Sequence, residues 1–258
     1  MQNFFQSHWK IIVALSVVIL LALLTVNPGP ASAAQELAER LRVHVSAIAS
    51  HEYNTRTPPS LESAAVYIEN ALAQSGYRST RQEYAAGGGR VRNIEASIGN
   101  VAKGKRPARI FIVGAHYDSA QGAPGANDNG SGTAAVLELA RMRPSPGTEV
   151  RFVFFVNEEP PYFMGEEMGS MVHAAELKRQ GLTVAAALVL ETMGYYTDKP
   201  NSQSLPPGLE GRYPGTGNFI AFVGTLESSA LVREVLAAFR AASDFPAHGW
   251  RRRRIRPG

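Results

Sequence analysis

Cysteine is absent from this chain of 258 residues. Its absence excludes disulfide bonds, a thiolate nucleophile and any zinc site built from cysteine ligands. The chain also lacks internal repeats and long low-complexity segments, and its residues are 45% hydrophobic against only 19% charged. This balance is typical of a globular protein, and the length is enough for one sizeable α/β domain plus a leader segment.

A strong net charge is also lacking once the C-terminus is set aside. The formal charge of +4 becomes −1 without the five arginines of residues 251–258. A body this close to neutral does not support a nucleic-acid partner. The basic tail suits contact with an anionic surface, and it is predicted to be disordered because it offers nothing apolar beyond Ile255 to bury.

Only one long hydrophobic run is present. Residues 11–26 are unbroken and mostly aliphatic, and they are followed by two prolines and the small-residue pattern ASA at residues 31–33. This layout is typical of a signal peptide, although the run could also anchor an uncleaved chain in a membrane. Residues 1–33 therefore predict an exported protein, either periplasmic or extracellular, or anchored in the membrane by residues 11–26.

Short apolar runs alternate with segments of helical periodicity over the rest of the chain. This alternation predicts a three-layer α/β/α fold with a mostly parallel mixed central sheet, over a domain of residues 34–250. A hairpin is expected around the three glycines at residues 87–89. Strands are expected at 78–84, 91–98, 109–113, 150–156, 184–190 and 219–223, and helices at 34–50, 61–74, 131–142, 169–180 and 227–242.

A set of polar side chains falls at or just beyond the carboxyl ends of the expected strands. Ligands bind at that edge of open α/β sheets. The set combines one imidazole with several carboxylates, and this mixture of nitrogen and oxygen donors suits a divalent cation. Its members are His116, Asp118, Asp128, Glu158, Glu159 and Glu191.

Four short motifs carry these side chains: GAHYD at residues 114–118, ANDNGSG at 126–132, NEE at 157–159 and LETMG at 190–194. Their order resembles the zinc-dependent exopeptidases with a co-catalytic metal pair, the bacterial leucyl aminopeptidase type, over roughly residues 57–245. Glutamate carboxypeptidases and glutaminyl cyclases belong to the same fold. The resemblance implies the zinc-peptidase type of α/β/α fold, with a zinc site at the carboxyl edge of the sheet.

The resemblance implies a role for each residue of the first two motifs. His116 would be a zinc ligand, and Asp118 would orient its ring without binding the metal itself. Asp128 would bridge both metals, although its Gly-rich surroundings also suit a simple turn or helix cap. A strained peptide bond is expected directly after Asp128.

In the third motif the resemblance makes Glu158 the general base and Glu159 a zinc ligand. A rival pair, Glu166 and Glu167, precedes Gly-Ser as the glutamate pair does in many family members. We favour the first pair because it is contiguous with a buried strand, which leaves residues 160–164 as an insertion lining the substrate cleft. Glu191 would be a further ligand, at a position where the best-known members carry aspartate.

The resemblance fails at the C-terminus. The family's last ligand is a histidine that follows Ser-Asp, whereas Ser243 and Asp244 are followed here by Phe245. His248 is the one histidine further along the chain, and four arginines follow it closely. The chain is therefore expected to be cut short or shifted out of frame near Trp250.

This departure limits the zinc site. One ion would keep His116, Asp128 and Glu191, whereas the other would keep only Asp128 and Glu159 unless His248 replaces the missing ligand. Two carboxylates without an imidazole make a weak zinc site. Up to two zinc ions are therefore expected, with one bound tightly, and this chain is expected to be inactive or nearly so.

The favoured function is a zinc-dependent aminopeptidase, which hydrolyses N-terminal peptide bonds with metal-activated water and Glu158 as general base. Its partners would be peptide substrates, and a membrane if the N-terminal segment is retained. One alternative is a glutaminyl-cyclase-like aminoacyltransferase with a single zinc ion. The other is a degenerate, non-catalytic, membrane-associated relative.

Overall fold

The computed structural model describes residues 30–205 and 211–252. The chain divides into two compact units, Met1–Arg40 and Leu41–Gly258, with the boundary inside helix α2 (Pro30–Ile48). Residues 1–29, most of the predicted leader, lie outside the described residues. None of the helices that the structure describes is long and apolar enough to cross a membrane.

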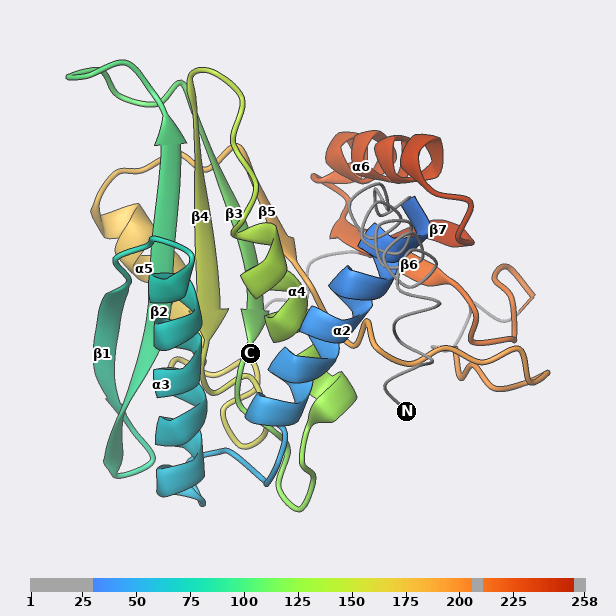
Figure 1. The fold of residues 1–258 in the computed structure, drawn as a ribbon, viewed down its shortest axis with the longest axis horizontal. Coiled ribbons are helices and arrows are strands. Elements are labelled where there is room, and N and C mark those ends of the chain that lie inside the picture. The colour runs from blue at the N-terminus through green and yellow to red at the C-terminus, as the bar shows by residue number, and fades with distance from the viewer. Residues whose placement is uncertain (1–29, 206–210, 253–258) are drawn as a thin grey trace, which may run out of the picture. The chain divides into compact units, whose positions relative to one another are not determined.

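A five-stranded mixed sheet forms the centre of the second unit (Figure 1). Its spatial order is β1-β2-β4-β3-β5. Strands β3 and β5 run parallel to each other, as do β3 and β4, whereas β2 is antiparallel to both β1 and β4. The strands are β1 (Thr80–Ala86), β2 (Gly89–Asn100), β3 (Arg109–His116), β4 (Thr148–Phe155) and β5 (Ala186–Val189).

The predicted hairpin joins β1 and β2. Ala86 pairs with Gly89, so Gly87 and Gly88 alone make the turn. Both have positive φ angles, 57° and 78°. A two-residue turn with φ positive at both positions matches the right-handed twist of the strands, and glycine adopts it without steric cost.

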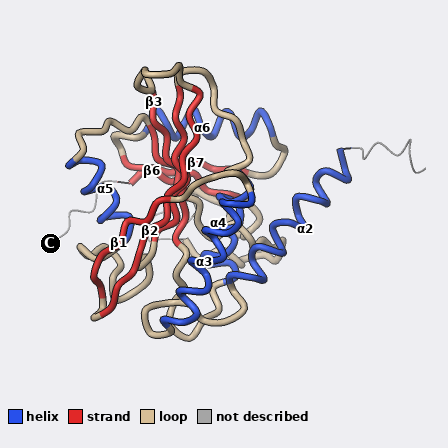
Figure 2. The backbone as a smooth tube through the Cα atoms, turned by 60° about the vertical axis from the view of Figure 1, so that its left-hand side comes forward, coloured by secondary structure: helices blue, strands red, loops and turns tan. Residues whose placement is uncertain are grey.

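Helices cover both faces of the sheet (Figure 2). On one face of the sheet, Phe152 and Phe154 of β4 pack against the helices α3 (Pro58–Gln74) and α4 (Gly132–Leu139). Val153 and Phe155 point the opposite way and contact Leu177 of α5 (Gly169–Arg179). Residues 152–156 are buried on both faces of the sheet, which is why they read as a continuous hydrophobic run. The expected three-layer fold is confirmed.

The C-terminal part departs from the expected arrangement. Strand β6 (Ile220–Thr225) does not join the central sheet but pairs in parallel with β7 (Ala247–Arg252), and α6 (Ser229–Ala242) connects the two. The sequence predicted no strand after residue 242, so β7 was missed. Because β7 extends to Arg252, the predicted tail loses its first two residues to a strand, and residues 253–258 lie outside the described residues.

Candidate metal centre

Three parallel strands end side by side and carry most of the predicted site residues. His116 is the last residue of β3 and is in register with Phe155, the last residue of β4. Glu158 and Glu159 follow β4 after a short turn, and Glu191 follows β5. Since parallel strands end at the same edge of a sheet, these side chains meet at the carboxyl edge.

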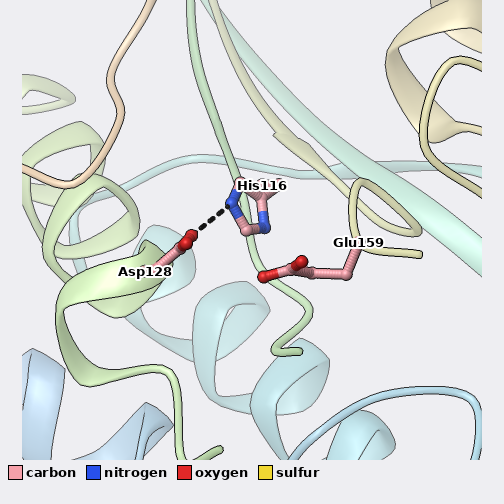
Figure 3. A group of neighbouring side chains, drawn as sticks. All are labelled: His116, Asp128 and Glu159. Atoms are coloured by element: carbon pink, nitrogen blue, oxygen red, sulfur yellow. Dashed lines mark hydrogen bonds and ion pairs between the residues drawn. The ribbon is translucent and has the colours of Figure 1, made fainter. Parts of the chain in front are cut away.

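The side chains of His116, Asp128 and Glu159 converge there (Figure 3). Each offers one ligand atom, and these atoms lie within 4.8 Å of one another. His116 Nε2 is 3.1 Å from Asp128 Oδ1 and 3.4 Å from Glu191 Oε2. Glu158 Oε2 is slightly further from the same nitrogen, at 3.8 Å. The structure thus brings all the predicted zinc ligands to one place, with the predicted base beside them.

The orientation of the His116 ring follows from Asp118. His116 Nδ1 is 3.0 Å from the backbone oxygen of Asp118 and 3.5 Å from its Oδ1. When Nδ1 carries the proton and donates it to these oxygens, Nε2 has a free lone pair. That lone pair points toward the carboxylates of Asp128 and Glu191. Ligating histidines use this arrangement, in which the second ring nitrogen is held by an oxygen acceptor.

Asp118 has a further role that its spacing from His116 did not reveal. Its carboxylate is buried and accepts the backbone N–H groups of Glu158, at 3.0 Å, and Glu159, at 3.1 Å. One side chain therefore fixes both the imidazole and the turn that carries the two glutamates. The sequence holds no local signal for this contact, because it joins segments 40 residues apart.

The site concentrates negative charge in partly buried surroundings. Burial, and then the neighbouring carboxylates of Glu191, Asp118 and Glu159, raise the pKa of Glu158 to about 7. Burial, and then Asp128, also raise the pKa of Glu159. For His116, burial lowers the pKa, but hydrogen bonds to Asp118, Asp128 and Glu191 outweigh it and raise the pKa to about 12. The groups around His116 therefore favour a positive charge at this point.

A zinc ion fits this donor set. Glu159 Oε1 is buried and has no hydrogen-bond partner among the described residues. A buried carboxylate oxygen without a partner is costly, and a cation would satisfy it. Two ligand atoms of a tetrahedral zinc site lie roughly 3.3 Å apart, given bonds of about 2.0–2.1 Å. The separations of 3.1 Å and 3.4 Å from His116 to Asp128 and Glu191 match that geometry.

The rival glutamates lie differently. Glu166 and Glu167 are both exposed. The backbone oxygen of Glu167 accepts hydrogen bonds from Tyr84 and Asn157, which fixes the loop in front of α5. Glu158 and Glu159 therefore lie close to His116, whereas Glu166 and Glu167 belong to the exposed loop in front of α5.

His248 lies on β7 and not in this cluster. Its ring packs edge-on against Phe219, with ring centroids 5.0 Å apart, and against Tyr213, at 6.0 Å. It also faces a mostly apolar groove of about 930 Å³ between β5, β6 and α6, and Glu191 is among the residues that line this groove. Aromatic and aliphatic side chains dominate the lining of this groove, among them Leu188, Leu190, Tyr195, Tyr213, Phe219 and Trp250.

Asp128 belongs to η1 (Ala126–Ser131), a wide helical turn with non-helical backbone angles at Asp128 and Asn129. The peptide bond between these two residues is cis, at the position where the family resemblance implied an unusual peptide. Asn129, which was not predicted as a site residue, is fully buried and donates a hydrogen bond to Glu191. The sequence held one sign of this role, a polar asparagine close to the start of a buried helix. It was interpreted only as part of a Gly-rich turn.

Comparison with known sequences agrees with these motifs. A family model described as Peptidase family M28 matches residues 96–232. The Escherichia coli protein YfbL is 40% identical over 200 residues, which cover 73% of this chain and 59% of that protein. Aminopeptidase YwaD of Bacillus subtilis is 42% identical over 77 residues, or 29% of this chain and 17% of that protein. The chain thus matches less than two thirds of the length of each relative.

Solved structures agree on the fold. A glutaminyl cyclase of Porphyromonas gingivalis has a TM-score of 0.59 and 19% identity, over 83% of this chain and 75% of that one. A Zn-dependent exopeptidase of Parabacteroides distasonis has a TM-score of 0.58 and 20% identity, over 83% of this chain and 76% of that one. Likeness at these identities shows the shared fold.

Proposed function

Because the chain belongs to peptidase family M28, whose match covers more than half of its residues, we propose that it carries a zinc-dependent aminopeptidase site. The observation that carries this proposal is the convergence of His116, Asp128 and Glu159 on one point at the carboxyl edge of the sheet. Glu191 adds a fourth donor, 3.4 Å from the imidazole.

His116, Asp128, Glu159 and Glu191 would hold zinc, which when bound polarises the scissile carbonyl and activates water. Glu158 lies beside these ligands and retains 27% side-chain exposure, so water can reach it. It would accept a proton from the attacking water and return it to the leaving amine. Asp118 keeps Glu158 in place through the backbone N–H that it accepts.

The surroundings of the site suit the N-terminus of a peptide. Several carboxylates close to one another attract the α-ammonium group, which a free peptide N-terminus carries. The apolar groove that Glu191 helps to line offers room for an uncharged side chain. These two features support hydrolysis of the first peptide bond over cleavage within a chain.

In the family arrangement one zinc position would have more donors than the other. His116, Asp128 and Glu191 would supply the first, whereas Asp128 and Glu159 would be the only described residues to supply the second. His248 packs against aromatic rings and supplies nothing to it. We therefore propose one tightly bound zinc ion and a weaker second position.

Export is part of the proposal. The apolar run at residues 11–26 and the small residues at 31–33 are typical of a signal peptide. A peptidase released or anchored outside the cytoplasm would meet peptides from its surroundings.

A direct test uses residues 34–258, loaded with zinc and freed of excess metal, and measures zinc per chain and release of leucine from a leucine reporter. The expected result is about one zinc ion per chain, with little turnover that rises when zinc is added in excess. Absence of zinc binding would contradict the proposal.

A glutaminyl-cyclase-like reaction is the second candidate, because the structural likeness to glutaminyl cyclases is as close as that to exopeptidases. A peptide with N-terminal glutamine separates the two reactions in the same preparation. Cyclisation without release of an amino acid would favour the transferase, whereas release of glutamine favours the aminopeptidase. If zinc binds but neither reaction is detected with excess zinc, the non-catalytic relative is favoured.

A further inference from the structure

Three side chains of η1 hold three consecutive backbone amides of the segment after β5. Asn129 Oδ1 accepts the N–H of Thr192 at 3.3 Å, and Ser131 Oγ accepts that of Met193 at 3.0 Å. Asn127 Oδ1 accepts the N–H of Gly194 at 2.8 Å. The segment that follows Glu191 is thus fastened to the segment that contains Asp128.

Asn129 differs from the other two because it also reaches Glu191 itself. Its Nδ2 donates to the backbone oxygen of Leu190 at 2.8 Å and to Glu191 Oε2 at 3.0 Å. Its Oδ1 also accepts the N–H of Gly132 at 2.9 Å. The side chain is 0% exposed, and both amide hydrogens and both lone pairs of the oxygen are used.

The fit around Asn129 leaves no spare room. A Cβ atom on Gly132 would lie 2.3 Å from Asn129 Oδ1 and 2.6 Å from the backbone oxygen of Leu190. The helix α4, the Asp128 turn and the Glu191 segment therefore meet at this one amide. Its position is fixed from three sides, so the donor that it presents to Glu191 is fixed as well.

We propose that Asn129 is a positioning residue that holds the Glu191 carboxylate beside His116 and Asp128 and so sets the affinity of the tighter zinc position. The Glu191 side chain is 45% exposed and would otherwise be free to rotate into solvent. Ordering it in advance removes a rotamer cost from zinc binding. The inference rests on the proposed zinc site, and Asn129 acts on that site through Glu191.

The test variant is Asn129→Ser. Serine retains a hydroxyl that can cap the N–H of Gly132, as serine does at helix N-termini, but is too short to reach Leu190 or Glu191. Zinc affinity, measured by competition with a chromophoric chelator, should fall about 10–100-fold, as expected for loss of a group that orients a ligand. The absorption spectrum of the Co²⁺-substituted protein should change in parallel.

Asn127→Ser is the matched control. It makes the same substitution two residues earlier and removes a bond to the Gly194 N–H but no contact with Glu191. Its loss of zinc affinity should be much smaller than that of Asn129→Ser. Thermal unfolding of both metal-free variants checks that each is folded. Equal losses in the two variants would overturn the proposal, because they would indicate a general loosening of the segment.

A double-mutant cycle with Glu191→Ala gives the sharpest test. If Asn129 acts through Glu191, Asn129→Ser should cause no further loss of zinc affinity when Glu191 is already absent. Additive losses would overturn the proposal. Asn129→Asp keeps the size and both accepted bonds of the side chain, and replaces the serine variant in the same cycle if that variant does not fold.

The inference and the proposed function fail in different ways. If the unsubstituted chain binds no zinc, the proposed function is wrong and this inference falls with it. If the unsubstituted chain binds zinc and Asn129→Ser binds it equally well, the inference alone is wrong.

Discussion

At the scale of single residues, two side chains outside the proposed ligand set hold the site residues in place. Asp118 accepts the N–H groups of Glu158 and Glu159, and its backbone oxygen accepts the proton of His116 Nδ1. Asn129 holds Glu191 in a similar way, because its side-chain amide donates a hydrogen bond to the Glu191 carboxylate. Ligands and base arise from four separate segments of the chain, so each needs an anchor to another segment.

Glu158→Gln should remove most of the hydrolysis measured with excess zinc and leave the zinc content almost unchanged. The amide keeps the shape of the side chain but cannot take a proton from water, and loss of a general base costs on the order of 10²–10⁴-fold in rate. Leucine release and zinc per chain should be measured on the same preparation. Glu166→Gln is the control. Glu166 is exposed, and among the described residues it makes no ion pair with His116, whereas Glu158 does.

If Glu158→Gln retains full activity while Glu166→Gln loses it, the base has been assigned to the wrong pair. Glu159→Gln gives a further contrast, because a lost ligand should lower zinc content as well as rate.

The sequence predicted which side chains would meet at this edge of the sheet, but not the contacts that hold them there. His116, Glu158, Glu159 and Glu191 follow strands whose hydrophobic runs are visible in the sequence, so their common edge could be inferred. The contacts of Asp118 and Asn129 join segments 40 and 62 residues apart. Such contacts depend on the final register of strands and turns, which local patterns do not contain.

At the scale of secondary-structure elements, each of the six strands that the sequence predicted is present, and the plainest signal is that of β4. β4 has Phe152, Val153 and Phe154 all fully buried, and its hydrophobic run could not be mistaken. β7 was missed because its residues include His248, Gly249 and arginines, which do not form a hydrophobic run. It is a strand because it pairs with β6. The turn η1 was read as a loop, since its own side chains bond to a segment about 60 residues further along the chain, which local patterns do not show.

Arg92 of β2 joins the sheet to helix α3. Its guanidinium makes two bonds to Glu62, at 2.6 Å and 2.9 Å, and one to Glu69 at 2.9 Å. Arg92→Met keeps the aliphatic stem but leaves the nearly buried Glu69 with one partner fewer, so it should lower the free energy of unfolding by about 1–3 kcal/mol at pH 7. Urea unfolding measures this directly.

The pH dependence of this effect has a definite sign. The hydrogen bond from Arg92 holds the pKa of Glu62 below its ordinary value of 4.5. A lowered carboxylate pKa stabilises the fold above the unfolded pKa, and this contribution is lost as the pH falls through the folded value. The difference between the parent and Arg92→Met should therefore narrow below about pH 4.5.

Arg90→Met is the matched control on the same strand. Arg90 pairs with Glu83 at 2.9 Å, but both side chains are well exposed. Exposed pairs contribute less than about 1 kcal/mol, so this variant should unfold almost as the parent does. Equal losses for the two arginines would show that Arg92 has no special part in docking α3.

At the scale of the whole molecule, the site lies next to a weakly supported part of the fold, the strand β5 and the Glu191 segment that follows it. β5 is an edge strand of the central sheet among the described residues, and Val189 on it is 56% exposed. The groove beyond β5 separates it from β6, which pairs with β7 instead. The Glu191 segment therefore has few backbone partners on its outer side, and its order depends on η1 and on the ligands near His116.

Zinc should accordingly raise the thermal stability of the folded chain. A ligand that binds only the folded state stabilises it by RT ln(1 + [L]/Kd), about 2.7 kcal/mol when free zinc is at 100 times Kd. For a chain of this size that corresponds to roughly 5–11 °C in Tm. Calorimetry with zinc, and again after addition of a chelator, should show the rise and its full reversal.

Variants identify which atoms this stabilisation comes from. Glu158→Gln should keep the zinc-dependent rise in Tm, because Glu158 is not a proposed ligand. Glu159→Gln should reduce it, since one oxygen of that carboxylate is buried without a hydrogen-bond partner among the described residues. His116→Ala should abolish it, because the tighter position then loses its imidazole. A rise in Tm that survives His116→Ala would mean that zinc stabilises the chain elsewhere, and the metal centre at the edge of the sheet would be wrong.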